Sequence, residues 1–252
     1  MNRPTSTDDW DRHWGDYAES AEKNPAQRYR TRLIFSGLGI GDSPCRLVDI
    51  GSGQGDFVAQ ARTRFPRADM LGIELSETGC RIARRKVPEA TFLRRDLLGP
   101  DDVPGRFRDW ATHAVLSEVL EHVDRPDLLL RHAIAYLDAG CRVVVTVPGG
   151  PMSAFDRHIG HRRHYTRGAL GELLENGGLE VKRVMAAGFP FHNLYRLAVL
   201  ARGRRLVADV AGPTSSNLLH RATTRAFDLS FHLNLPATPW GWQLVAVAQL
   251  PR

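Results

Sequence analysis

Cysteine is scarce in this sequence of 252 residues and occurs at only three positions, Cys45, Cys80 and Cys141. None of the three belongs to a CxxC pair, and their number is odd. This argues against a disulfide framework and against a zinc site built from thiolates. We expect all three cysteines to be small, buried, apolar side chains.

Long apolar runs are also missing, and no segment has the length of a membrane span or the pattern of a signal peptide. The first residues, MNRPTSTDDWDRHWGDY, are polar with interspersed aromatics. We therefore expect a cytoplasmic protein. The sequence has no internal repeat, and its 42% hydrophobic and 25% charged residues are ordinary for one large α/β domain with additions.

Lysine is rare, since Lys23, Lys86 and Lys182 are the only lysines among 34 basic residues and all the others are arginines. The net charge of +6 suits an anionic substrate, a nucleic acid or a membrane surface. The arginines are spread along the chain, and no compact RNA-binding module is visible. We therefore expect a small-molecule partner rather than a nucleic acid, with a peripheral membrane contact as an alternative.

Short apolar runs alternate with amphipathic helical stretches from Arg46 onward, which is the pattern of βαβ units around a parallel sheet. The predicted strands are 46–50, 69–75, 90–96, 112–118 and 141–147. The predicted helices between them are 56–65, 76–86 and 125–137. Asp124 is the expected N-terminal cap of the last of these helices.

The pattern changes after the fifth strand and predicts a helix over 166–178, a strand over 179–188 and a final strand over 242–250. The roughly fifty residues between the last two strands are too many for a hairpin loop, and they contain two segments with helical apolar spacing. We therefore divide the chain into an N-terminal helical cap (1–44), a core (45–188), a helical insertion or lid (189–240) and the final strand (241–252).

The stretch LVDIGSGQGDF places three glycines directly after the first predicted strand and before a helix. This order presents backbone N–H groups and a helix N-terminus at the carboxyl edge of the sheet, where a nucleotide-like ligand approaches closely. The turn from Gly51 to Gly55 has the spacing GxGxG, whereas the dinucleotide fingerprint is GxGxxG. An adenosine cofactor other than NAD is therefore favoured, and a dehydrogenase is the alternative.

The region from Leu47 to at least Val147 resembles the class I S-adenosylmethionine-dependent methyltransferases, because VDIGSGQG, GIELS, RRDLL and SEVLEHVDRP follow one another as in that family. The resemblance implies S-adenosylmethionine as cofactor. It also implies a doubly wound, Rossmann-like α/β sheet of seven strands, parallel except for one antiparallel strand near the C-terminus. The cofactor-binding residues that it implies are Asp49, Gly51, Ser52, Gly53, Gly55, Glu74, Leu75, Asp96, Leu97 and Ser117.

Within that set, the resemblance implies a distinct role for each of three carboxylates. Asp49 lines the methionine part of the cofactor together with the glycine turn, Glu74 accepts hydrogen bonds from both ribose hydroxyls, and Asp96 lies beside the adenine amine. A carboxylate suits the ribose because it offers two acceptor oxygens to two neighbouring donors.

Two histidine-rich stretches border the expected methyl-transfer site, SEVLEHV after the fourth strand and DRHIGHRRHYT after the fifth. His122 and His161 are the candidate catalytic bases. An imidazole with a pKa near ~6.5 is well matched to deprotonating a hydroxyl at neutral pH.

Glu118, Glu121 and His122 form an ExxEH pattern. With His161 as the second histidine, after the fifth strand, it resembles the metal site of ubiquinone-pathway catechol O-methyltransferases and small-RNA 2′-O-methyltransferases. The resemblance implies a divalent ion such as Mg²⁺ bound by Glu118, Glu121, His122 and His161, which would lower the pKa of an acceptor hydroxyl. The chain lacks the sequence that the quinone enzymes carry around their histidine. The alternative is that Glu121 and His122 only brace the loop.

The predicted function is methylation of a small, apolar molecule, most simply at oxygen. The alternatives are C-methylation of an isoprenoid or polyketide, RNA 2′-O-methylation and a non-catalytic cofactor-binding module. Phe189, Phe191 and Tyr195 follow the sixth predicted strand and are expected to contact the acceptor. The apolar faces within 189–240 must bury against each other, the acceptor, a membrane surface or a second copy of the chain, so a lid and a homodimer interface are both open.

Overall fold

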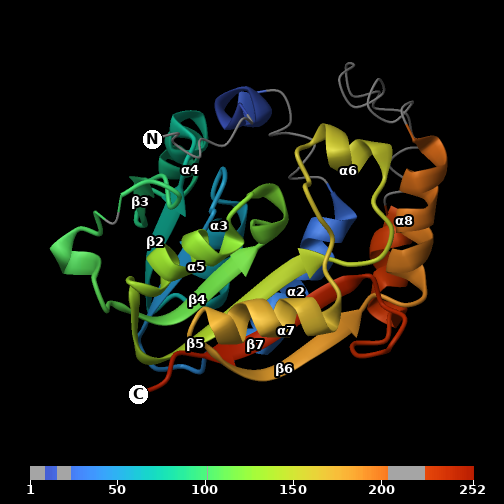
Figure 1. Ribbon diagram of the computed structural model, residues 1–252. Coiled ribbons are helices and arrows are strands. Elements are labelled where there is room, and N and C mark those ends of the chain that lie inside the picture. Colours follow the sequence, from blue (N-terminus) through green and yellow to red (C-terminus); the bar gives the residue numbers. More distant parts are fainter. Residues whose placement is uncertain (1–8, 16–23, 101, 204–224) are drawn as a thin grey trace.

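Seven strands form one sheet in the computed structural model, which describes residues 9–15, 24–100, 102–203 and 225–252 (Figure 1). The strand order is β3-β2-β1-β4-β5-β7-β6, and β7 runs antiparallel to both of its neighbours. The strands are β1 (Cys45–Ile50), β2 (Ala68–Glu74), β3 (Thr91–Arg94), β4 (Ala111–Ser117), β5 (Leu137–Pro148), β6 (Glu180–Ala187) and β7 (Gln243–Gln249). The predicted mixed sheet with one reversed strand is confirmed.

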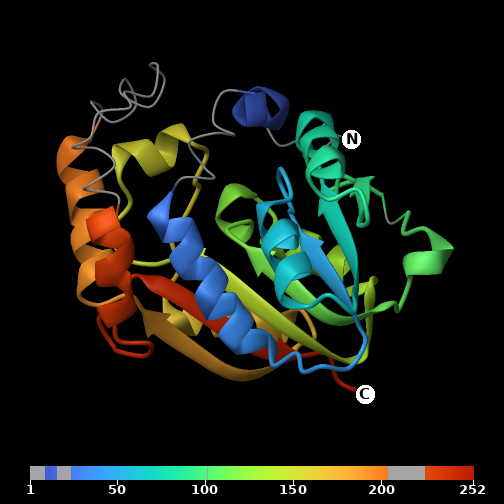
Figure 2. The same cartoon turned by 180° about the vertical axis from the view of Figure 1, so that it is seen from behind.

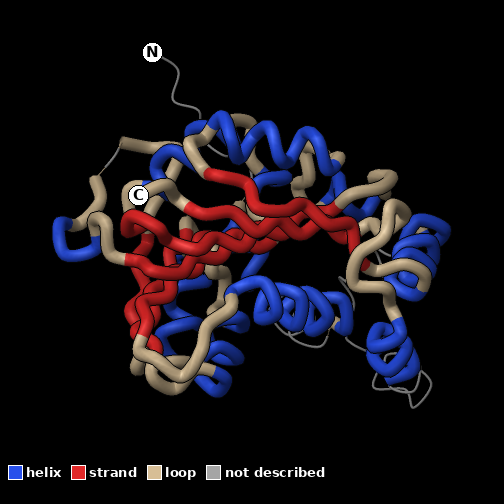
Figure 3. The backbone as a smooth tube through the Cα atoms, turned by 90° about the horizontal axis from the view of Figure 1, so that it is seen from below, coloured by secondary structure: helices blue, strands red, loops and turns tan. Residues whose placement is uncertain are grey.

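Helices cover both faces of this sheet (Figures 2 and 3). One face is covered by α2 (Pro25–Leu38), α3 (Asp56–Arg64) and α4 (Glu77–Lys86), and the other by α5 (Pro126–Ile134) and α7 (Arg167–Asn176). The core therefore has two apolar layers, one on each side of the central strands β1, β4 and β5. The three cysteines are free; Cys80 and Cys141 are buried as expected, whereas Cys45 is only half-buried.

Several helices, α2, α4 and α7 among them, begin at local capping signals in the sequence. The side chain of Asn24 accepts a hydrogen bond from the N–H of Ala26, and Pro25 occupies the first turn of α2. Ser76 caps α4 and Thr166 caps α7 in the same way. The predicted helix over 125–137 is too long, since α5 ends at Ile134.

The end of α5 is set by the fifth strand, which begins earlier than the sequence pattern indicates. Leu137 is already paired with Ala111 of β4, and Tyr136 and Leu137 are buried in the core. These two residues therefore belong to the sheet layer and not to a helix face. β5 consequently has 12 residues instead of the predicted seven.

The parallel register brings the carboxyl ends of β1, β2, β3 and β4 to one edge of the sheet, where β5 also ends. Above this edge lie a short helix over 10–15 and α6 (Ala154–His158), with α8 (Phe191–Arg202) packed against α6 (Figures 1 and 2). Three single-turn helices are η1 (Gly105–Phe107), η2 (Leu120–His122) and η3 (Phe231–Leu233), and residues 225–230 before η3 are also helical.

The insertion predicted over 189–240 is described at 189–203 and 225–240, and the residues between fall outside the described part of the chain. Its two ends are tied together by Asn193, whose side chain donates to the carbonyl of Trp240 at 2.7 Å and accepts from the N–H of Trp242 at 3.0 Å. Asn234 caps α8 by accepting from the N–H groups of Phe191 and His192. None of the described helices is long and apolar enough to cross a membrane.

Candidate active site

The glycine turn between β1 and α3 lies at the carboxyl edge of the sheet. Gly51, Gly53 and Gly55 have φ angles of 75°, 53° and 79°, in the left-handed region that residues with a side chain rarely adopt. A Cβ atom at Gly51 would also lie 2.4 Å from Cγ2 of Val119. The positive φ angles of the turn and the close approach of the loop after β4 thus explain why glycines occupy these positions.

Glu74 ends β2 beside this turn and is 6% exposed. Its Oε2 accepts a hydrogen bond from the N–H of Gly53, and its Oε1 accepts one from the N–H of Ser76, both at 2.8 Å. Burial raises the pKa of Glu74, and these two hydrogen bonds oppose the rise. Each oxygen retains a second acceptor position, so the carboxylate is able to accept from two neighbouring hydroxyls.

Asp49 lies within β1, between Gly72 of β2 and Val115 of β4, and is 3% exposed. Burial, together with the charge of Glu74, raises the pKa of Asp49 from 3.8 to about 8. Two buried carboxyl groups with raised pKa values favour a cationic ligand, because a positive charge stabilises both ionised forms.

The short helix over 10–15 covers the glycine turn. Oδ1 of Asp11 accepts from the hydroxyl of Ser76 at 2.6 Å and from the N–H of Thr78 at 2.7 Å, which ties this helix to the start of α4. The indole of Trp14 lies against Gly53, where a Cβ atom would come within 2.4 Å of its Cζ2. The helix therefore closes the space above the turn.

The other members of the predicted cofactor set lie at the ends of neighbouring strands. Asp96 follows β3, is exposed, and accepts from the N–H of Leu98 at 2.9 Å. Ser117 ends β4, and its hydroxyl lies 3.0 Å from that of Thr146. Three more members are placed close by: Ser52 is buried in the turn, while Leu75 and Leu97 are half-buried just after β2 and β3.

Glu118, a predicted metal ligand, has an unusual backbone conformation with a φ of 57°. Its Oε1 accepts from Nε2 of Gln243 at 2.9 Å and from the hydroxyl of Thr146 at 3.2 Å. Its Oε2 lies 3.7 Å from Nη1 of Arg30. Strained backbone of this kind persists where the surroundings hold it, and it is concentrated at functional sites.

Glu121, His122 and His161 come together on the loops after β4 and β5, with one potential ligand atom from each within 4.8 Å of the others. Glu121 is fully buried, and neither of its carboxylate oxygens has a hydrogen-bond partner within the described residues. Burial, and then the charge of Glu118, raise the pKa of Glu121 well above its ordinary value. The structure thus gathers three of the four predicted metal ligands and leaves Glu118 outside the group, because Glu118 is held by Thr146 and Gln243.

The two candidate bases are in ring contact. The ring centroids of His122 and His161 are 4.6 Å apart in an edge-on arrangement. The ring of Trp10, from the short helix, also packs edge-on against His122, with the centroids 4.8 Å apart. Burial, with smaller contributions from neighbouring charges, lowers the pKa of His122 to about 3 and that of His161 to about 4. Both imidazoles are therefore neutral at pH 7.

The tautomer of His161 follows from its hydrogen-bond chain. Nδ1 of His164 lies 3.1 Å from the carbonyl of Gly150, which only accepts, so this nitrogen carries the proton. Burial lowers the pKa of His164, and its Nε2 is then an acceptor 3.2 Å from Nδ1 of His161. Nδ1 of His161 must donate to it, which leaves Nε2 of His161 with a free lone pair.

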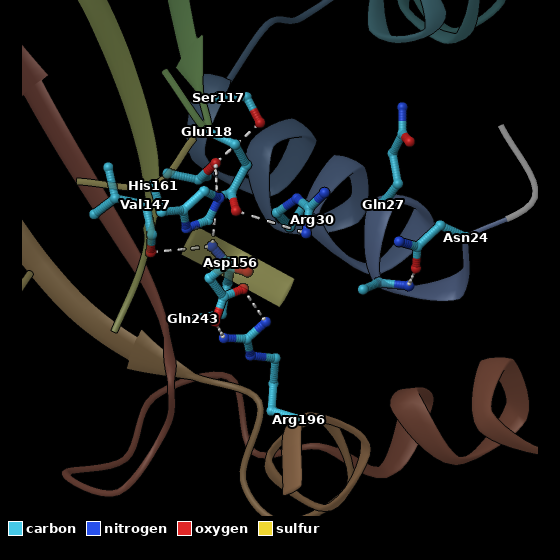
Figure 4. A network of polar contacts seen from close by, with 12 residues as sticks. Asn24, Gln27, Arg30, Ser117, Glu118, Val147, Asp156, His161, Arg196 and Gln243 are labelled. Carbon is cyan, nitrogen blue, oxygen red and sulfur yellow. Dashed lines mark hydrogen bonds and ion pairs between the residues drawn. The ribbon is translucent and has the colours of Figure 1, made fainter. Parts of the chain in front are cut away.

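Asp156 anchors the loop that carries these histidines. It forms a capping box with Ser153 at the start of α6 and a two-fold hydrogen-bonded ion pair with Arg196 of α8, at 2.9 and 2.7 Å (Figure 4). Burial opposes ionisation of Asp156, but the hydrogen bonds and charge of Arg196 outweigh it and lower the pKa to about 2. Asp156 also lies near His161 and His164, and because Arg196 engages both of its oxygens we do not count it as a metal ligand.

Aromatic side chains from α2, α8 and η3 form a cluster next to this network. Tyr29 and Phe231 are buried at its centre, and Tyr195 packs edge-on against Phe231 with ring centroids 5.8 Å apart. Of the three residues predicted to contact the acceptor, Phe191 and Tyr195 belong to this aromatic cluster. Phe189 instead contacts Trp240.

Two residues of the site could not be recognised from the sequence pattern, Arg30 of α2 and Gln243 of β7. Both reach Glu118, from positions 88 residues before it and 125 residues after it. Arg162 and Arg163, on the segment after β5, have structural roles, since they donate to carbonyls of the loop over 122–124.

Sequence comparison places this site in a known family. The family model described as a methyltransferase domain matches residues 17–184. Trans-aconitate 2-methyltransferase of Mycolicibacterium gilvum is 34% identical over 112 residues, 42% of this chain and 39% of that protein. The enzyme of the same name from Methylobacterium nodulans is 32% identical over 104 residues, which are 40% of this chain and 38% of that protein. The matched region thus spans about two fifths of these relatives.

Solved structures of methyltransferases share the fold at low sequence identity. Phosphoethanolamine N-methyltransferase 2 of Haemonchus contortus, in complex with S-adenosyl-L-methionine, has a TM-score of 0.62 at 14% identity, covering 98% of this chain and 61% of that one. Geranyl diphosphate C-methyltransferase of Streptomyces coelicolor has a TM-score of 0.56 at 16% identity, covering 89% of this chain and 76% of that one. Since the family model covers more than half of the chain, the chain belongs to the methyltransferase-domain family, and the solved structures show that it shares the fold of S-adenosylmethionine-dependent methyltransferases.

Proposed function

We propose that the protein transfers the methyl group of S-adenosylmethionine to an oxygen atom of a small molecule with a largely apolar body. The observation that carries the proposal is the free lone pair on Nε2 of His161, on the loop that Asp156 links to α8, the helix that contributes Tyr195 to the aromatic cluster. Methyl transfer needs little beyond alignment, exclusion of water and removal of a proton, because the cofactor supplies the activated methyl group.

The residues at the carboxyl edge fit S-adenosylmethionine. The cofactor carries a sulfonium and an ammonium charge, which suits the two buried carboxyl groups of Asp49 and Glu74. The glycine turn presents backbone N–H groups without side chains at this edge of the sheet, which suits close approach of a nucleoside ligand. We assign the ribose hydroxyls to Glu74 and the methionine part to Asp49 and the turn.

In the proposed reaction the acceptor oxygen forms a bond to the methyl carbon as the bond from that carbon to sulfur breaks. The hydroxyl proton passes to Nε2 of His161, and S-adenosylhomocysteine remains. Nδ1 of His161 stays hydrogen-bonded to His164, so the ring is held in one orientation. The charge of Asp156 raises the pKa of His161 against the effect of burial and so stabilises the imidazolium that forms.

A metal-assisted form of the same reaction is the second candidate, because the buried oxygens of Glu121 and Nδ1 of His122 have no hydrogen-bond partner in the described part of the chain. With His161 these residues offer three ligands, and a divalent ion held there would lower the pKa of the acceptor hydroxyl. Chelation separates the two forms: it abolishes turnover if an ion is needed, whereas full activity in excess chelator leaves His161 as a simple base.

Incubating the purified protein with methyl-labelled S-adenosylmethionine and fractionated cell extract tests the proposal. We expect the label to appear in a small organic-soluble product as an O-methyl group. His161→Ala should slow its formation by about a hundredfold or more, the typical contribution of a general base. His158→Ala, at the exposed end of α6, is the matched control and should leave the rate unchanged.

Other outcomes of this assay contradict the proposal in distinct ways. A label on carbon favours C-methylation, and a label in RNA favours 2′-O-methylation. Cofactor binding without any labelled product from any fraction favours a non-catalytic module.

A further inference from the structure

Arg30 of α2 is a half-buried arginine with spare hydrogen-bond donors. Its side chain is 19% exposed and points toward Glu118 at the carboxyl end of β4 (Figure 4). Within the described residues its single polar partner is Glu118, at 3.7 Å from Nη1 to Oε2, which exceeds hydrogen-bond distance. A guanidinium has five N–H donors, so Arg30 has donors that remain available to an anion.

Arg196, at the same site, is an arginine whose guanidinium is hydrogen-bonded to a carboxylate. Its side chain is 15% exposed, close to the value for Arg30, yet it makes two hydrogen bonds to Asp156, at 2.9 and 2.7 Å. The two arginines therefore differ in their partners and not in their burial. The spare donors belong to Arg30.

The charge of Arg30 acts on the acceptor side of the site. Burial is the main cause of the shifted pKa values of His192 and Tyr195 on α8, and the charge of Arg30 contributes to both shifts. Both rings pack against Phe231 of the aromatic cluster. Arg30 thus acts on the side of the site where this cluster lies.

The cofactor side of the edge has different electrostatic neighbours. The pKa of Asp49 is set by burial and by the charge of Glu74, and that of Glu74 by burial and its local hydrogen bonds. Arg30 is not among the main causes of either shift. This favours the acceptor over the cofactor as the source of the anion that Arg30 would bind.

Glu118 holds one side of Arg30 without using up its donors. The glutamate is itself fixed by Gln243 and Thr146, and its backbone has a positive φ. A planar guanidinium has more than one donor edge, so it is able to face a fixed carboxylate on one side and take a second carboxylate on another. A carboxylate matches this donor geometry with two parallel hydrogen bonds.

We propose that the methyl acceptor is a carboxylic acid and that Arg30 binds its carboxylate beside the aromatic cluster. This inference rests on the proposed function and names the class of its acceptor, an apolar body with an acidic group. The relatives named as trans-aconitate 2-methyltransferases are consistent with it, since trans-aconitate is itself a carboxylic acid. Arg30 is then a specificity-determining residue.

Calorimetric titration of the protein saturated with S-adenosylhomocysteine tests the inference with matched probes. The pairs are benzoate with benzamide, cinnamate with cinnamamide, and trans-aconitate with its trimethyl ester. We expect at least one acid to bind about tenfold or more tightly than its neutral partner, the scale of a charge-assisted hydrogen-bonded pair. Arg30→Met should remove this preference, and Arg30→Lys should retain part of it because the charge remains.

Arg28→Met is the matched control, because Arg28 lies on the same helix with its side chain 44% exposed and paired with Asp228. It removes the same charge and should leave the preference for acids unchanged. The inference is overturned if acids and neutral partners bind equally, if no acid binds at about 10 mM, or if Arg30→Met weakens S-adenosylhomocysteine and not the acids. In the last case Arg30 holds the carboxylate of the cofactor.

These readouts separate the inference from the proposed function, because binding is measured without turnover. Acids that bind through Arg30 support the inference even if no O-methylated product is ever found. An O-methylated product from a neutral acceptor, formed equally well by Arg30→Met, supports the function and overturns the inference.

Discussion

Replacing Glu74 with alanine should weaken S-adenosylmethionine binding by roughly 1–3 kcal/mol, or about tenfold to hundredfold in dissociation constant. The variant loses the proposed acceptor of both ribose hydroxyls. It also removes the hydrogen bonds that the N–H groups of Gly53 and Ser76 donate to Glu74 at 2.8 Å, so the glycine turn is held less firmly. Isothermal titration calorimetry measures the change directly.

Two further variants sharpen this test. Glu74→Gln keeps the shape and one carbonyl acceptor, so its loss of affinity should be smaller than that of Glu74→Ala. Glu77→Gln, in the first turn of α4 with its side chain 53% exposed, removes a nearby charge that faces solvent and should have no effect. Unchanged affinity in Glu74→Ala would place the ribose elsewhere, and tight NAD binding without S-adenosylmethionine binding would indicate a dehydrogenase site.

Asp49→Asn should have opposite effects on the stability of the ligand-free protein and on cofactor binding. The pKa of Asp49 is about 8 in the folded protein and 3.8 ordinarily, so the folded state retains a proton that the unfolded chain releases between these values. Stability of the ligand-free protein therefore falls as the pH rises through this window. Asparagine stays neutral, so the variant should unfold at a higher temperature than the natural protein near pH 8 and at about the same temperature near pH 4.

Cofactor affinity should respond in the other direction. The positive charges of S-adenosylmethionine favour ionised Asp49, so the natural protein should bind it more tightly as the pH rises toward about 8, with release of a proton. Asp49→Asn should bind more weakly and lose this pH dependence. Thermal unfolding with and without cofactor measures both effects, and Asp69→Asn, exposed on the same sheet, is the control. Identical pH profiles for Asp49→Asn and the natural protein would contradict the assignment.

The sheet could be predicted from the sequence because its determinants are local. Apolar runs of strand length, capping residues such as Ser76 and the turn from Gly51 to Gly55 each act over a few neighbouring positions. The boundary between α5 and β5 was predicted wrongly because it depends on pairing with Ala111, which lies 26 residues before Leu137. The apolar pattern of the residues around Leu137 does not reveal a pairing partner so distant in the sequence.

The candidate site divides in the same way. Glu74 and the glycine turn could be predicted as cofactor-binding residues because they belong to sequence motifs. Arg30 could not be predicted, because arginines also stand at positions 28 and 32 and nothing in the sequence distinguishes the three. The structure separates them: Arg28 and Arg32 lie near Asp228, and Arg30 faces Glu118. Glu118 has the spacing of a metal ligand, but Gln243, 125 residues later, holds it outside the group formed by the other three predicted ligands.

A crystal structure of the protein with S-adenosylhomocysteine tests the central claim most directly, that this edge of the sheet binds the cofactor and presents its methyl group to an acceptor near His161. We expect the ribose hydroxyls within hydrogen-bond distance of Glu74, the amino group on the side of Asp49, and the indole of Trp14 against the bound nucleoside. The sulfur should face the space bounded by His161, Arg30 and Tyr195. A nucleoside bound away from Glu74, or a sulfur directed away from His161, would contradict the account.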